Sequence, residues 1–257
     1  MTKDIYNFSI IYANSNKYLQ PIISSTHYYF DNKYEFNNSI HYLPIYITHL
    51  SFGNIFNEKI DNLLLSFDKL IYMYFQNCFN NSVCNLPSSI IYLRFGWCFN
   101  QPVDNLPSNL MYLTLNLCFN QPVDNLPSNL IYLKFKKSFN QFVDNLPFNL
   151  TYLEFGSSFN RTVDNLPLSL THIIFGEYFN QMIENLPFGL KHIEFYYSSC
   201  FNIQLNYLPD SVEYIVLNNK YELLISNLPS KLKKIKCNLN YKYKSVFEQQ
   251  NIIVEIH

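Results

Sequence analysis

The stretch CFNQPVDNLPSNL occupies residues 98–110 and recurs unchanged at residues 118–130. The Phe of each Phe-Asn pair marks a period of twenty residues, and the markers in strict register are Phe79, Phe99, Phe119, Phe139, Phe159 and Phe179. Phe36 and Phe56 precede this series, and Phe201, Tyr221 and Tyr241 follow it after short insertions. Repetition at this period is typical of a solenoid, in which each unit packs only on its neighbours.

One unit, residues 126–145, reads LPSNLIYLKFKKSFNQFVDN. Its apolar residues fit neither a long helix nor a long strand, and only YLKF has the alternation of a strand. Pro127 lacks an N–H, and the Ser-Asn and Asp-Asn pairs favour turns, so the remainder is expected to be loop. We therefore predict coils of about 20 residues with one short strand each. The strands would pair in parallel, and the convex connections would be irregular.

The ends of the chain match the repeat poorly. Residues 36–241 are therefore assigned to the solenoid, with an N-terminal cap at residues 1–35 and a C-terminal cap at residues 242–257. A solenoid needs atypical terminal units because its open ends would otherwise expose core side chains. No second domain is expected.

The repeat resembles two known families. Leu126, Pro127, Leu130, Leu133 and Phe135 resemble a leucine-rich repeat of the short bacterial effector type. The pair Phe-Asn followed by Gln-Pro-Val, at residues 119–123, more closely resembles the FNIP repeat, a leucine-rich-repeat-like family of social amoebae and giant DNA viruses.

The FNIP resemblance implies a β-rich, leucine-rich-repeat-like solenoid that acts as a non-enzymatic interaction module. Some family members carry an N-terminal F-box that links the repeats to a ubiquitin ligase. Residues 1–35 lack the F-box pattern and are too short for that domain, so this role is not carried over.

Composition narrows the expected partners. Lys and Arg total 18 against 19 Asp and Glu, so no global positive field attracts nucleic acid or anionic lipid. The N-terminus has no signal-peptide pattern and no later stretch is apolar enough to span a membrane, so a cytoplasmic location is expected, in the host cytoplasm if the protein is viral. The six cysteines are then expected to be free thiols.

Stacked coils turn each repeat position into a column of side chains about 4.8 Å apart. The Asn of each Phe-Asn pair and the Asn of each Asn-Leu-Pro triplet are expected to form ladders between coils. The Asp column, which contains Asp104, Asp124, Asp144 and Asp164 with Asp61 and Glu184 at its ends, is expected to accept local backbone N–H bonds in turns.

The candidate binding surface is the outward side of the strands. If Leu133 and Phe135 point inward, Tyr132 and Lys134 point outward. One outward column stays aromatic and its neighbour varies in size and charge. The residues assigned to this surface are Tyr92, Arg94, Tyr112, Thr114, Tyr132, Lys134, Tyr152, Glu154, His172, His192 and Glu194. The aromatic column has two interpretations, direct binding of a partner and ring packing between strands.

The predicted function is binding of a protein of unknown identity, with no cofactor and no metal. One alternative is contact with nucleic acid or a membrane surface through the basic segment KLKKIKCNLNYKYKS near the C-terminus. Another is a metal-dependent enzyme that uses the His or Asp columns. Both are weaker than the protein-binding hypothesis, because lysines at an exposed sheet edge also prevent aggregation and the polar residues form rows rather than a unique pocket.

Overall fold

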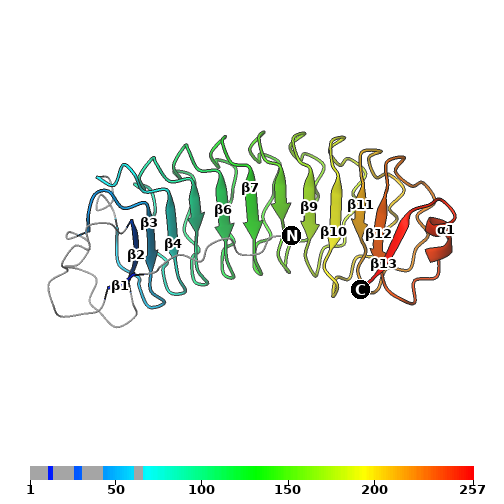
Figure 1. The fold of residues 1–257 in the computed structure, drawn as a ribbon, viewed down its shortest axis with the longest axis horizontal. Helices are drawn as coiled ribbons and strands as arrows, with labels where there is room; N and C mark the ends of the chain where they lie inside the picture. Colours follow the sequence, from blue (N-terminus) through cyan, green and yellow to red (C-terminus); the bar gives the residue numbers. More distant parts are fainter. Residues whose placement is uncertain (1–10, 14–25, 31–42, 61–65) are drawn as a thin grey trace.

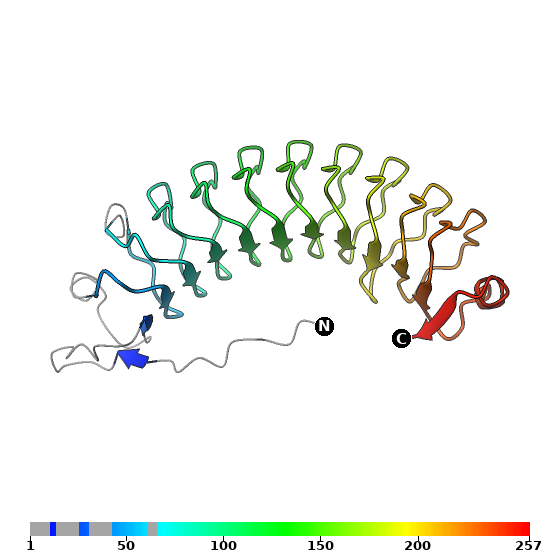
Figure 2. The ribbon, with the colours of Figure 1, turned by 45° about the horizontal axis from the view of Figure 1, so that its top comes forward.

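The computed structural model describes residues 11–13, 26–30, 43–60 and 66–257. These residues form a curved solenoid whose thirteen strands make one parallel sheet in chain order (Figure 1). The strands line the concave side of the arch and the connecting segments form its convex side (Figure 2). The predicted solenoid of short parallel strands is therefore confirmed.

The strands are three or four residues long. Their bounds are β1 Ile11–Ala13, β2 His27–Phe30, β3 His49–Phe52, β4 Tyr72–Phe75, β5 Tyr92–Arg94, β6 Tyr112–Leu115, β7 Tyr132–Phe135, β8 Tyr152–Glu154, β9 His172–Phe175, β10 His192–Phe195, β11 Tyr214–Val216, β12 Lys234–Cys237 and β13 Ile253–Ile256. Among the described residues there is one helix, α1, at Lys244–Glu248.

The register of the sheet follows the alternation of the YLKF segment. Leu133 pairs with Leu113 on one side and with Leu153 on the other. Leu133 and Phe135 are fully buried, whereas Tyr132 and Lys134 are partly exposed on the concave face. A slip of one residue would exchange these two sets, so burial of one face specifies the pairing.

A tight turn delivers the chain into each strand. In the coil before β7, the N–H of Leu130 donates to the carbonyl of Pro127 at 3.1 Å. The N–H groups of Ile131 and Tyr132 then both donate to the carbonyl of Met111 in the preceding coil, at 3.0 Å. The Leu-Pro segment is therefore the point where each coil turns and joins the ladder.

Stacked phenylalanine rings fill the core. Within one coil the rings of Phe135 and Phe139 lie 3.7 Å apart between centroids. Between coils, Phe135 lies 6.0 Å from Phe155, and Phe139 lies 6.1 Å from Phe159. Each ring thus has apolar neighbours in its own coil and in the next, as expected for a core that exists only when coils stack.

The asparagine of each Phe-Asn pair forms a ladder, as predicted. The backbone N–H of Asn140 donates to Oδ1 of Asn120 at 2.9 Å, and the N–H of Asn160 donates to Oδ1 of Asn140 at 3.0 Å. The same contact recurs from Asn57 to Glu222. The side-chain carbonyl therefore replaces the sheet partner that the backbone lacks outside the strands.

The Asp column has a different partner from the one predicted. Oδ1 of Asp124 accepts a bond from Nδ2 of Asn145 at 3.1 Å, and Asp144 accepts one from Asn165 in the same way. The predicted local backbone bonds are therefore wrong, because the amide of the next coil lies within reach of the carboxylate. Asp61 and Phe36 lie outside the described residues.

The sheet extends into both terminal segments. Strands β1 and β2 lie within residues 1–35, and β13 pairs in parallel with β12. Helix α1 places the buried ring of Phe247 against Tyr241, with 5.8 Å between centroids, and so ends the row of rings. The assignment of these segments as caps stays a prediction.

We expect Phe135→Ala to lower the free energy of unfolding by about 3–5 kcal/mol, because it removes a fully buried ring from two stacks. Urea unfolding followed by circular dichroism measures the change. Phe148→Ala is the matched control, since Phe148 is 71% exposed and its loss is expected to cost less than about 0.5 kcal/mol. Equal losses in both variants would contradict the stacked core.

Candidate functional site

The aromatic column runs along the concave face from His27 to Tyr214. Its tyrosines form stacked pairs: Tyr92 with Tyr112 at 4.4 Å and Tyr132 with Tyr152 at 4.5 Å between centroids. Between the pairs, Tyr112 and Tyr132 are tilted and 6.0 Å apart. The rings therefore pack on one another across strands while their outer edges stay partly exposed.

The outward column beside the aromatic one varies in solvent exposure as well as in residue type. Arg94 is exposed, whereas Thr114, Lys134 and Glu194 are partly exposed. Arg94, Thr114 and Lys134 occupy adjacent register positions on β5, β6 and β7. The structure thus brings these predicted residues together in one row on the concave face.

Glu154 is an exception, because it is only 5% exposed. Its carboxylate accepts the hydroxyl of Tyr152 at 3.0 Å and that of Tyr196 at 2.8 Å, and it pairs with Lys134 at 2.6 Å. Glu154 therefore lies in the outward row with Lys134, as predicted, but neighbouring side chains bury it and it is not available as an exposed binding residue. Its carboxylate is occupied as the acceptor of a polar cluster.

Tyr196 reaches Glu154 from two coils away. The positions equivalent to Tyr196 are Gly156 in the coil of Glu154 and Gly176 in the coil between them. A Cβ on Gly176 would lie 1.9 Å from the carbonyl oxygen of Gly156, so only glycine permits this approach of the backbones.

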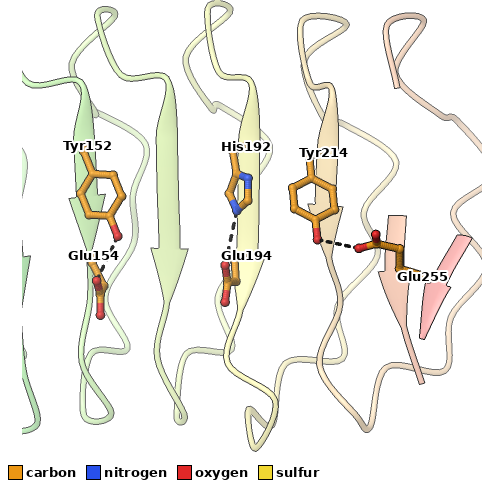
Figure 3. Close-up of polar contacts among 6 residues, drawn as sticks. All are labelled: Tyr152, Glu154, His192, Glu194, Tyr214 and Glu255. Carbon is orange, nitrogen blue, oxygen red and sulfur yellow. Dashed lines mark hydrogen bonds and ion pairs between the residues drawn. The ribbon is translucent and has the colours of Figure 1, made fainter. Parts of the chain in front are cut away.

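Other aromatic residues of the column point toward carboxylates in the same way. Figure 3 shows Tyr152 directed at Glu154, His192 at Glu194 and Tyr214 at Glu255. The His192 Nε2 to Glu194 distance is 3.4 Å, and the Tyr214 hydroxyl donates to Glu255 at 3.5 Å. These contacts orient the polar tips of the rings along the strands.

In the Glu154 cluster, burial and charge keep the two tyrosines neutral beside the ion pair of Lys134 and Glu154. Burial, followed by the charge of Glu154, raises the pKa of Tyr152 and of Tyr196. For Lys134, burial lowers the pKa, but the hydrogen bond and charge of Glu154 outweigh it and the net shift is upward. The two phenols therefore stay protonated at neutral pH, which does not suit them for acid–base catalysis.

The metal hypothesis finds no assembled site in the part of the chain that the structure describes. There, no group of three or more His, Cys, Asp or Glu side chains is placed to hold a metal ion. His172 and His192 stack at 5.5 Å between centroids, and burial, followed by the charge of His192, lowers the pKa of His172. The Asp carboxylates accept amides of the next coil, as described above.

The basic C-terminal segment is partly neutralised. Lys233 pairs with Glu213 at 2.5 Å, and Lys234 pairs with Glu255. Lys244 donates to the carbonyl of Leu239. Within the described residues, no helix has the length and apolar character to cross a bilayer.

Two surface features escaped the sequence interpretation. Phe148, Leu168 and Phe188 occupy the position after the Leu-Pro proline in three consecutive coils and are 71%, 66% and 73% exposed. The sequence shows this change, because the same position is serine in the earlier coils, at Ser88, Ser108 and Ser128.

The second feature is an open groove on the side of the sheet where the strands begin. Its lining residues are Ser89, Ile91, Asn109, Met111, Asn129, Ile131 and Asn149. The amides of Asn109, Asn129 and Asn149 donate to backbone carbonyls of the preceding coil, which gives these residues a structural role.

Comparison with known proteins identifies the repeat. The FNIP Repeat family model matches residues 79–118, 119–158, 143–178 and 159–198. A search of characterised proteins gave no match.

Solved structures show the same fold. The crystal structure of CroV588, described as a novel circular LRR protein structure, is 41% identical with a TM-score of 0.71 over 76% of this chain and 31% of that one. YopM from Yersinia enterocolitica WA-314 is 20% identical with a TM-score of 0.50 over 75% of this chain and 42% of its own. The chain thus spans less than half the length of either protein.

We expect Glu154→Ala to destabilise the solenoid by about 2–4 kcal/mol, because it leaves the partly buried Lys134 ammonium and two tyrosine hydroxyls without their acceptor. Chemical denaturation measures the loss. Glu154→Gln, which keeps an acceptor oxygen, should recover part of it. Glu194→Ala at the same position two coils later is the control and should cost less than about 1 kcal/mol. A smaller loss for Glu154→Ala than for this control would argue against the cluster.

Acidification is expected to destabilise the coils around β3. Burial, followed by the charge of His27, lowers the pKa of His49 to about 4 from 6.5. The unfolded chain therefore binds more protons between these values, so stability is complete above pH 6.5 and falls as the pH drops toward 4. The loss from His49 should be about 1–2 kcal/mol, since solvent screens this partly exposed ring.

Urea unfolding between pH 4 and pH 7 measures how the free energy of unfolding changes with pH, and the slope of that change is the quantity to compare. His49→Tyr, which places at this position the residue that Tyr72 supplies in the next coil, should flatten it. An unchanged slope in that variant would rule out His49 as the source.

Proposed function

This chain is an FNIP-repeat protein, and we propose that its concave strand face binds another protein. Leucine-rich-repeat-like solenoids of this kind are generally non-enzymatic scaffolds for protein interaction. Which surface of this chain binds, and what it binds, are the parts that we propose.

The observation that carries the proposal is the contrast between two kinds of column. The core positions and the Asn-ladder positions repeat almost without change, because they supply the Phe stacks and the bonds between coils. Arg94, Thr114 and Lys134 share one equivalent position on the concave face, yet they differ in size and charge. No contact that repeats from coil to coil requires these identities, whereas recognition of a partner would.

The aromatic column supports the same surface. Tyr92 and Tyr112 stack on each other and so present rigid, partly exposed edges with hydroxyl groups. Tyrosine in such a setting offers apolar area and a hydrogen-bonding group while losing little conformational entropy on binding. Ring packing and partner binding are therefore compatible roles for the same residues.

The alternatives have less support. The basic C-terminal segment uses Lys233 and Lys234 in ion pairs, which reduces the charge available to a polyanion. The His and Asp columns form rows of repeated contacts rather than one pocket with a distinct acid, base or nucleophile. We accordingly propose a binding protein without enzymatic activity, and a cytoplasmic location suits its exposed free thiols.

Tyr112→Ser combined with Tyr132→Ser is expected to abolish capture of the natural partner from native cells, because it removes the ring edges at the centre of the face. Quantitative affinity purification with mass spectrometry measures capture, and a thermal melt checks that the variant is folded.

The matched control is Phe148→Ser combined with Phe188→Ser, which removes two exposed rings outside the strand face. The control should capture the same proteins as the unmodified chain. Loss of capture in the control but not in the tyrosine variant would move the binding surface away from the strands.

A further inference from the structure

Three cations, Arg94, Lys134 and Lys136, gather at one part of the concave side. Arg94, Lys134, Lys136 and Lys137 are the basic residues between positions 92 and 138, all of which the structure describes. Asp104 and Asp124 are the acidic residues of the same span, and both lie on the convex side, where they bond to Asn125 and Asn145. The concave side of these coils therefore carries positive charge that its own coils do not neutralise.

The neighbouring coil supplies a single counter-charge. Glu154 pairs with Lys134, but this carboxylate is buried and already accepts two tyrosine hydroxyls. Lys136 lies two residues from Lys134, on the same side of the chain. Burial, followed by the charge of Lys134, lowers the pKa of Lys136, so the two ammonium groups are close enough to repel each other. One carboxylate for these three cations leaves a clear deficit of negative charge.

The guanidinium of Arg94 is held in position without an acid. It lies over the ring of Tyr74, with 4.7 Å from Cζ to the ring centroid. Among the described residues no carboxylate lies within ion-pairing distance of Arg94. A guanidinium stacked on a ring keeps its N–H edges free to bind a carboxylate with two hydrogen bonds.

The short side chain of Thr114 lies between the cation on β5 and those at β7. In the register of the sheet, Thr114 stands between Arg94 and Lys134, which are therefore about 10 Å apart at the backbone. The arginine and lysine side chains are long, whereas the threonine is short and partly exposed. A carboxylate above Thr114 would lie between cations on both sides, where its charge is best stabilised.

We propose that the basic patch formed by Arg94, Lys134 and Lys136 receives an acidic segment of the protein partner, with a carboxylate seated above Thr114. This inference rests on the proposed function, since it assigns a chemistry to the partner of the strand face. Charge complementarity of this kind sets the orientation of a partner and speeds its association.

The surroundings of the basic patch favour a short acidic segment over a nucleic acid. The patch covers three coils, and the concave face beyond it carries Glu154 and Glu194. A long polyanion that followed the sheet would meet the partly exposed carboxylate of Glu194, whereas a few acidic side chains seated on the patch would not. The net charge of −1 also provides no general attraction for nucleic acid.

The chain contains a built-in reporter for the test. Trp97, the single tryptophan of the chain, is 53% exposed on the turn that follows β5. A short synthetic peptide of alternating Glu and Ser should change the emission of Trp97 on titration, and the effect should weaken as salt is added. The same peptide with Gln in place of Glu should give no change.

Arg94→Glu combined with Lys136→Glu is expected to weaken binding of the Glu peptide by about tenfold or more. Lys69→Glu combined with Lys220→Glu changes the net charge equally at two exposed lysines elsewhere and should leave binding within about twofold. Failure of the Glu peptide to bind, or an equal loss in both variants, would overturn the inference. So would tighter binding of a single-stranded RNA oligonucleotide of matched charge.

Partner capture separates this inference from the proposed function. If the tyrosine variant loses the partner and the Arg94→Glu, Lys136→Glu variant keeps it, the face binds a protein of other chemistry and only the inference fails. If the charge-reversed variant also loses the partner, the acidic segment is supported. If neither variant loses the partner, the proposed function fails, whatever the peptide titration shows.

Discussion

Each coil of this protein buries its phenylalanines only because the next coil closes over them. Phe135 and Phe139 stack on each other within the coil and on Phe155 and Phe159 in the next one. A single twenty-residue unit has one strand of three or four residues and cannot satisfy its own backbone or cover its own rings. Repetition of the unit is thus a physical requirement of the core, and it keeps the core and ladder positions nearly constant.

That constancy leaves the exposed positions free to differ between coils, and the outward residues of the strands are among them. Alternation along each strand separates the buried Leu133 and Phe135 from the outward Tyr132 and Lys134, so a change on one side does not disturb the other. The outward residues still interact among themselves, as the stacked tyrosines and the Glu154 cluster show. The face is therefore an ordered array of side chains, and order of this kind reduces the entropy lost on binding a partner.

Much of the fold could be predicted from the chain alone. The YLKF alternation predicted the strand at Tyr132–Phe135, and the recurrence of Asn after Phe predicted a ladder. The partner of the Asp column was predicted wrongly, because the acceptor of Asn145 is Asp124, twenty-one residues earlier. An Asp-Asn pair is compatible with a local turn bond and with a bond between coils, and only the distance between the coils shows which one forms.

The sequence by itself determined the period, the parallel strand in each coil and the side of each strand that is buried, since these follow from the spacing of apolar residues and from backbone geometry. Only the tertiary structure decided which outward residues are available to a partner. Glu154 is buried because Tyr196 reaches it from forty-two residues away, whereas Arg94 stays exposed on the ring of Tyr74. Such contacts depend on side-chain length and on the curvature that brings distant coils together, and neither leaves a periodic signal in the sequence.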